Sequence, residues 1–404
     1  MWHRCRRRPQ STLGRERRSR GGVGRAREAV TTLFRGRVHG VAGADAVAVE
    51  DGVITWVGAG RPPQRPDEEV VAETDGWIAP GFIDLQANGF NGHDAAGGSG
   101  EIASMSEGLP STGVTSFLPT LISAPVQDGA GFAAAAVAAA ADSRGARVLG
   151  AHIEGPFINP AFRGAHEVEF LVEPSAEAVE VIARARPRLV TLAPELPGAL
   201  DAIRRLTRSG VVVSAGHTGA DFDQGVRAIT AGVRFGTHIY NAMAPVHHRR
   251  PGIALALLLD RRVTVGLIAD GEHLHAAICA QLVRIEDFTR IALTTDQTAA
   301  AGAPPGAYNL GGRHVVSDGM VVRLEDGTLA GSAATMDGLV RRMAAVPGMN
   351  AARAIAMAST VPARVLGERG LGRIRAGACA DIVVLDSALR VRLTMVGGTV
   401  RFRN

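Results

Sequence analysis

The middle of the chain repeats one pattern, in which a short apolar run ends in polar or charged residues and a helical pattern follows. Continuous apolar runs of this length are typical of parallel strands that are buried on both faces. Eight such runs occur, at 81–88, 114–121, 147–154, 189–195, 211–217, 234–241, 263–270 and 291–296. Alanine-rich segments such as 132–142 and 201–208 fit the intervening helices. We therefore predict an α/β fold with a (β/α)8 barrel over residues 81–373.

The two ends of the chain follow a different pattern. Residues 29–80 and 374–404 alternate between apolar and polar positions, with glycine and proline between the runs. We predict that these segments together form a small β-sandwich domain, into which the barrel is inserted.

Residues 1–28 stand apart in composition. Ten arginines and one acid, Glu16, give residues 1–27 a charge of +9, so that the rest of the chain carries −4 of the overall +5. A mildly acidic body does not suggest a nucleic-acid-binding protein. We expect a disordered extension here, while a basic nucleic-acid arm and a transit-like segment are the alternatives.

The remaining composition narrows the compartment and the chemistry. No apolar run reaches the 18 residues of a transmembrane helix, so we expect no membrane partner. Three widely spaced cysteines make neither a disulfide-rich secreted domain nor a cysteine-based zinc site, which favours the cytoplasm. All cations are arginine, and the absence of lysine excludes a Schiff-base or carboxylated lysine.

Polar side chains gather where the predicted strands end. In a (β/α)8 barrel the carboxyl ends of the strands converge on one mouth, where active sites lie. The residues expected there are Gln86, Asn88, Glu154, Glu195, His217, His238, Asp270 and Asp296.

Three of these residues are suited to holding a metal ion. A catalytic zinc site uses three protein ligands from histidine and carboxylate and leaves room for water. Glu154, His217 and His238 form such a set, and a metal there lowers the pKa of water toward about 7. A single histidine at a strand end is more often structural, but three candidates at one mouth favour the metal.

Further residues could act beside a metal. A carboxylate at Asp296 could take a proton from water and pass it to a leaving amine, although aspartate is also a common helix cap. His273 could stabilise an oxyanion, and His275 competes for that role. The segment 247–250 contains two histidines and two arginines, and Arg249 presents a fork suited to phosphate unless the segment is simply an exposed loop.

From about residue 32 to the C-terminus, the chain resembles the N-acetylglucosamine-6-phosphate deacetylases of the amidohydrolase superfamily. The most specific strings are His152-Ile153-Glu154-Gly155-Pro156 and Thr237-His238-Ile239-Tyr240-Asn241-Ala242-Met243. Further matching stretches are 80–89, 164–166, 193–195, 216–218 and 329–332, and the closing 372–383 is shared more widely among amidohydrolases.

The resemblance implies roles for individual residues. Glu154, His217 and His238 are then the metal ligands, Asp296 the catalytic acid/base, and His273 the group on the acetyl carbonyl. The implied substrate contacts are His166, Asn241, Ala242, Leu329, Ala330, Ser332 and a phosphate-binding Arg249. In the family this arginine reaches across a dimer interface, so the resemblance also implies a homodimer.

The first strand indicates a single-metal subtype. Most amidohydrolases carry His-x-His there, but this chain has Gln86 and Asn88, and neutral amides are poor zinc ligands. We expect these amides to bond a water beside the site, and one divalent ion per subunit, with zinc favoured over Fe(II), Co(II) or Mn(II).

Three alternatives stay open at this point. The same chemistry could act on N-acetylgalactosamine 6-phosphate, because nothing in the sequence distinguishes the C4 epimers. A different amidohydrolase activity, such as deacylation of an N-acyl amino acid, would put a carboxylate on Arg249. A catalytically inactive binding protein would lack a ligand or an acid/base, and every role here has an occupant.

Overall fold

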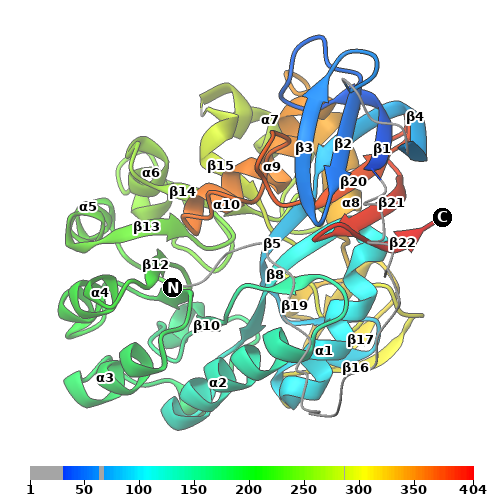
Figure 1. Cartoon of the computed structure of the whole chain (residues 1–404). Coiled ribbons are helices and arrows are strands. Elements are labelled where there is room, and N and C mark those ends of the chain that lie inside the picture. Colours follow the sequence, from blue (N-terminus) through cyan, green and yellow to red (C-terminus); the bar gives the residue numbers. More distant parts are fainter. Residues whose placement is uncertain (1–30, 63–67, 286) are drawn as a thin grey trace, which may run out of the picture.

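The computed structural model describes residues 31–62, 68–285 and 287–404 (Figure 1). Eight parallel strands succeed one another in chain order around a barrel. They are β5 (Phe82–Ala87), β8 (Val114–Leu121), β10 (His152–Glu154), β11 (Leu189–Leu192), β12 (Val212–Ala215), β13 (Val233–Gly236), β14 (Thr264–Leu267) and β15 (Ile291–Leu293). A short β9 (Arg147–Val148) also pairs with β8. The predicted barrel is confirmed.

The barrel closes between β15 and β5. There the backbone N–H of Asp296 donates to the carbonyl of Gln86 at 3.0 Å, and Ala87 bridges Gln297 in parallel register. Most of the observed strands are shorter than the predicted runs. Apart from Gln86 within β5 and Glu154 at the end of β10, the polar residues therefore lie in the loops at the barrel mouth.

Helices surround the barrel (Figure 1). Their bounds are α1 (Ser99–Gly108), α2 (Val126–Asp142), α3 (Ala176–Ala185), α4 (Ala199–Arg208), α5 (Phe222–Ala231), α6 (Gly252–Leu259), α7 (Ala276–Ile285), α8 (Met336–Ala344), α9 (Ala351–Ala358) and α10 (Thr360–Val365). In α4 the buried Ala199, Ala202, Ile203 and Leu206 follow helical spacing and face the strands, while arginines occupy the outer face. No helix in the described ranges is long and apolar enough to cross a membrane.

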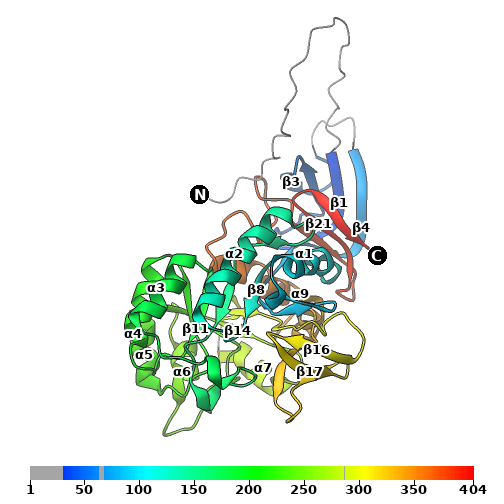
Figure 2. The same cartoon turned by 90° about the horizontal axis from the view of Figure 1, so that it is seen from below.

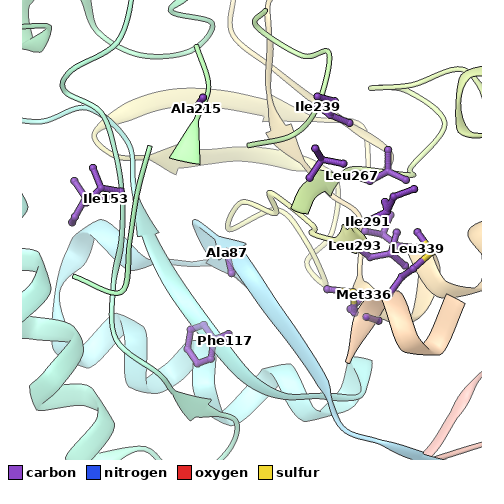
Figure 3. Close-up of a cluster of buried hydrophobic side chains, with 14 of the residues drawn as sticks. Ala87, Phe117, Ile153, Ala215, Ile239, Leu267, Ile291, Leu293, Met336 and Leu339 are labelled. Atoms are coloured by element: carbon purple, nitrogen blue, oxygen red, sulfur yellow. The ribbon is translucent and has the colours of Figure 1, made fainter. Parts of the chain in front are cut away.

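The core lies between this ring of helices and the strands. All eight residues of β8 are buried, as expected for a strand that is covered on both faces. Figure 3 shows Met336 and Leu339 of α8 beside Ile291 and Leu293 of β15, within the same buried cluster. The helix that follows the last strand therefore packs back onto it.

The chain ends form one sheet in the order β22-β21-β20-β4-β1-β2-β3. Its strands are β1 (Thr31–Val38), β2 (Ala46–Glu50), β3 (Val53–Gly58), β4 (Glu68–Pro80), β20 (Ile382–Leu385), β21 (Val391–Val396) and β22 (Thr399–Arg403). The sheet folds over, so that Ile54 donates to the carbonyl of Ala378 and Ala380 to that of Gly52, both at 2.9 Å. A separate core lies inside, and the predicted sandwich from both termini is confirmed. It lies beside the barrel, away from α4 and α5 (Figure 2).

Two small sheets were not predicted. An antiparallel sheet of β16 (Gly306–Leu310), β17 (Arg313–Ser317), β18 (Val321–Arg323) and β19 (Leu329–Ser332) is inserted between β15 and α8. The second consists of β6 (Gly89–Phe90) and β7 (His93–Asp94). The turn Gly311-Gly312, with positive φ at both residues, joins β16 to β17 and is a common hairpin signal that the sequence did contain.

Candidate active site

A cavity of about 390 Å³ opens at the carboxyl ends of the barrel strands. Most of the predicted site residues line it: Asn88, Glu154, His166, His217, His238, Asn241, Ala242, His273, Asp296 and Leu329. They come from the carboxyl ends of six different barrel strands and the loops that follow them, as the barrel geometry predicts.

Three atoms of the predicted metal ligands form a nearly equilateral triangle. The Nε2 atoms of His217 and His238 are 3.1 Å apart, and they lie 3.3 and 3.2 Å from Oε1 of Glu154. Burial alone would raise the pKa of Glu154, but hydrogen bonds and charge from both histidines hold that pKa well below its ordinary value. The carboxylate is therefore ionised and faces two imidazole nitrogens.

The hydrogen bonds of the rings determine which nitrogens carry protons. Nδ1 of His217 lies 2.9 Å from the carbonyl oxygen of Phe162, which can only accept, so this nitrogen is protonated and Nε2 is the ring nitrogen that faces Glu154. Nδ1 of His166 instead accepts the backbone N–H of Ser123 at 3.0 Å. The neutral ring of His166 then carries its proton on Nε2.

His166 is close enough to Glu154 to be considered as a ligand too. Glu154, His166 and His217 each offer an atom within 4.8 Å of the others. The Nε2 of His166 lies 3.8 Å from Oε2 of Glu154, and burial, the largest effect, holds the pKa of His166 well below its ordinary value. We favour His238 as the third ligand, because its Nε2 is nearer and the Nε2 of His166 bears a proton.

Asp296 is fixed by two amides of the first strand. Its Oδ1 accepts from Nδ2 of Asn88 at 2.7 Å and from Nε2 of Gln86 at 3.0 Å, and the same Gln86 nitrogen donates to Glu154 at 2.9 Å. Burial, reinforced by the charge of Glu154, raises the pKa of Asp296 to about 6. Such a carboxyl group can both take up and release a proton near neutral pH.

A second carboxylate orients His273. Oδ2 of Asp270 lies 2.7 Å from Nδ1 of His273, and Oδ1 accepts the backbone N–H groups of Glu272 and His273. His273 lines the cavity. His275 is exposed, and its Nδ1 accepts from the backbone of Ala277 at the start of α7. Of the two histidines considered for stabilising an oxyanion, His273 therefore lines the cavity, whereas His275 is exposed beside α7.

Four of the predicted residues adopt left-handed backbone conformations. The φ angles are +51° at His217, +26° at His238, +48° at Ala242 and +49° at Asp296. Each costs about 1–3 kcal/mol in a residue other than glycine, and such strain is concentrated at functional sites. This clustering supports the assignment of the site independently of the sequence motifs.

Three predicted substrate contacts lie elsewhere. Ala330 is buried in a cluster behind the cavity. Oγ of Ser332 donates to the carbonyl of Thr295 at 2.7 Å, and its backbone N–H donates to that of Asp296 at 2.8 Å, so Ser332 supports the loop of the acid/base. Arg249 is on an exposed loop, with Nη1 2.8 Å from Nε2 of His248, and it does not line the cavity of its own chain.

The structure adds residues that the sequence did not reveal. Ile122, Phe162, Leu310 and Thr328 also line the cavity. From the inserted sheet, Arg313 donates to the carbonyl of Ala165 at 2.9 Å and pairs with Glu167 at 2.9 Å. It thereby holds the loop that carries His166 on both sides. The pairs Gly311-Gly312, Asp318-Gly319 and Asp326-Gly327 at its three turns were the hairpin signals for this insertion in the sequence.

Comparison with known proteins places the chain in a family. The amidohydrolase family model matches residues 77–401. The chain is 39% identical to N-acetylglucosamine-6-phosphate deacetylase of Danio rerio, over 80% of this chain and 83% of that protein. It is 38% identical to N-acetylgalactosamine-6-phosphate deacetylase of Escherichia coli O157:H7, over 87% and 93%.

One solved structure resembles this chain in both fold and sequence. It is an Asp-to-Ala mutant of N-acetyl-D-glucosamine-6-phosphate deacetylase from Mycobacterium smegmatis, in complex with N-acetyl-D-glucosamine 6-phosphate. The TM-score is 0.85 at 32% identity, covering 92% of this chain and 99% of the other. Since the family model spans most of the chain and these relatives align along nearly all of it, the chain belongs to the amidohydrolase family.

Proposed function

We propose that this protein hydrolyses the acetamide of N-acetyl-D-glucosamine 6-phosphate to D-glucosamine 6-phosphate and acetate. The observation that carries the proposal is the triangle of Glu154, His217 and His238 with Asp296 beside it in one cavity. Relatives of both sugar specificities support the reaction class.

The triangle fits one divalent metal ion. Ligand atoms about 2.0–2.1 Å from a tetrahedral ion lie about 3.3–3.4 Å from one another, close to the 3.1–3.3 Å observed. Two imidazoles and a carboxylate suit zinc best, while Fe(II), Co(II) and Mn(II) accept the same ligands. When bound, the ion supplies Lewis acidity and lowers the pKa of water.

The amides of Gln86 and Asn88 favour one metal over two. Their N–H groups already stabilise the carboxylates of Glu154 and Asp296, a task that a second cation would otherwise perform. Oε1 of Gln86 and Oδ1 of Asn88 are buried and have no partner among the described residues. We propose that these oxygens bond water.

The chain's own residues then perform the proton transfers. Asp296 takes a proton from the attacking water, and the acetyl carbon becomes tetrahedral. His273, whose Nδ1–H is held by Asp270, donates from Nε2 of the doubly protonated ring to the developing oxyanion. Asp296 finally gives its proton to the departing amine, and the C–N bond breaks. His166, Asn241 and Leu329 line the cavity and would orient the sugar.

The phosphate of the proposed substrate would be matched by an arginine side chain. Among the described residues that line the cavity there is no arginine, and Arg249 lies outside on its exposed loop. We propose that Arg249 of a second subunit completes each site in a cytoplasmic homodimer. Its guanidinium fork suits a phosphate dianion.

Acetate release from N-acetylglucosamine 6-phosphate by the zinc-loaded protein tests the reaction, with the galactosamine epimer measured alongside. Asp296→Asn should lower kcat by about 10²–10⁴ while metal stays at one ion per chain. Asp287→Asn, on the exposed surface, is the matched control and should retain full activity. If neither epimer releases acetate although metal is bound, the substrate assignment fails, and N-acyl amino acids would be tested next.

Coexpressing Asp296→Asn and Arg249→Ala chains tests the shared site. If Arg249 serves the partner, mixed dimers contain one intact site each, and random mixing restores about a quarter of the sites. If Arg249 serves its own chain, no site is intact and activity stays at the level of the separate variants.

A further inference from the structure

Glu195 is a mouth residue that the proposed reaction does not use. It follows β11, is half-buried, and accepts three hydrogen bonds from uncharged donors. Oε1 accepts from Nδ2 of Asn159 at 2.8 Å and from the backbone N–H of Gly219 at 2.7 Å, and Oε2 accepts from Oγ1 of Thr218 at 2.5 Å. All three of these donors are uncharged, so the Glu195 carboxylate links these segments by hydrogen bonds and not by ion pairs.

These donors belong to the loops that hold the metal ligand His217. Thr218 and Gly219 follow it directly. Asn159 lies in the loop after β10, and its backbone N–H donates to the carbonyl of His217 at 3.0 Å. One carboxylate therefore connects the loops after three consecutive barrel strands, β10, β11 and β12.

Glu195 also acts on the group that orients the imidazole. Through Oδ1, the side chain of Asn159 caps the short helix η3 (Pro160–Phe162) by accepting the N–H of Ala161 at 2.9 Å. The carbonyl of Phe162 at the end of this helix accepts the Nδ1 proton of His217. The side chain of Asn159 is thus bonded to Glu195 through Nδ2 and, through Oδ1, to the helix that ends at Phe162.

The backbone at His217 needs such support. Its φ of +51° is strained for a residue with a side chain, and such a conformation persists only where surrounding contacts enforce it. The loops are also in close contact, because a Cβ on Gly219 would lie 2.6 Å from the ring of Phe162. The hydrogen bonds of Glu195 hold the chain immediately after the strained residue.

We propose that Glu195 is a positioning residue of the metal site, which fixes the tautomer and ring orientation of His217 and thereby increases metal affinity. This inference rests on the proposed function, in which His217 is a metal ligand. Groups that orient a metal-binding histidine commonly contribute 10–100-fold to metal affinity.

The test is zinc affinity, measured by competition with a chromogenic chelator and independent of substrate. Glu195→Ala should bind zinc about 10–100-fold more weakly. Glu195→Gln should lose less, because its remaining carbonyl oxygen can still accept from Asn159 and Gly219. Glu368→Gln is the matched control. Its carboxylate is buried and pairs with Arg188 at 2.7 Å, outside the metal site, so zinc affinity should not change.

Two further variants separate the outcomes. Asn159→Ala combined with Glu195→Ala should cost less affinity than the product of the single effects, because both act along one path. His217→Ala should abolish zinc binding, and if it does not, the proposed ligand set fails. If His217→Ala abolishes binding but Glu195→Ala binds zinc as the native protein does, or no more weakly than Glu368→Gln, the positioning role of Glu195 is overturned.

Discussion

Replacing Asp84 by asparagine should change how the stability of the protein depends on pH. Asp84 is fully buried in the seam where β5 meets β15. Its carboxyl group accepts from Oγ1 of Thr295 at 2.5 Å, from the backbone of Gln86 at 3.2 Å and from the backbone of Thr295 at 3.3 Å. Asparagine has nearly the same shape, keeps one acceptor oxygen and does not ionise.

The magnitude follows from the pKa of this group. Burial raises the pKa of Asp84 to about 6 from 3.8, because the hydrogen bonds compensate only partly for lost hydration. The folded state therefore binds the proton more tightly than the unfolded state, and the resulting stabilisation is present at low pH and lost as pH rises through 6. The full effect is about 3 kcal/mol, of which about 1.4 kcal/mol falls between pH 5 and pH 8.

The effect is measured as the free energy of unfolding by urea of the native protein and of Asp84→Asn, at pH 5 and at pH 8, with a metal chelator present. The free energy of unfolding of Asp84→Asn, relative to the native protein, should increase by about 1.4 kcal/mol from pH 5 to pH 8. His152, whose pKa burial lowers to about 4, acts in the opposite direction but equally in both proteins. Parallel pH profiles for the two proteins would refute the reasoning, since they would mean that Asp84 titrates alike in the folded and unfolded states.

Three more outcomes are expected. Removing metal with a chelator should lower Tm reversibly, since an ion at 1,000 times its Kd stabilises the fold by about 4 kcal/mol; an unchanged Tm would argue against a metal site. Phe117→Ala should cost about 3–5 kcal/mol of unfolding free energy, because Phe117 is fully buried, whereas Val137→Ala at a half-exposed position should cost little. Arg313→Ala should raise KM by loosening the His166 loop while leaving zinc affinity unchanged, and a loss of zinc instead would contradict the role assigned to that loop.

The sequence alone determined the architecture and the chemical inventory. Parallel strands buried on both faces require continuous apolar runs, and helices require their own spacing, so eight repeats were visible without any tertiary information. Because the carboxyl ends of barrel strands must converge, the polar residues after those runs could be grouped into one site. The resemblance then assigned roles to Glu154, His217, His238 and Asp296.

Only the tertiary structure decided how these groups act. Hydrogen bonds between distant loops set the protonated nitrogen of His217, aligned Gln86 and Asn88 with two carboxylates, and placed His273 rather than His275 in the cavity. Such details depend on burial and on partners far apart in sequence, which local patterns do not encode. The same holds for Ser332, which supports the Asp296 loop instead of lining the cavity, and for Arg249, whose exposed loop places it outside the cavity of its own chain.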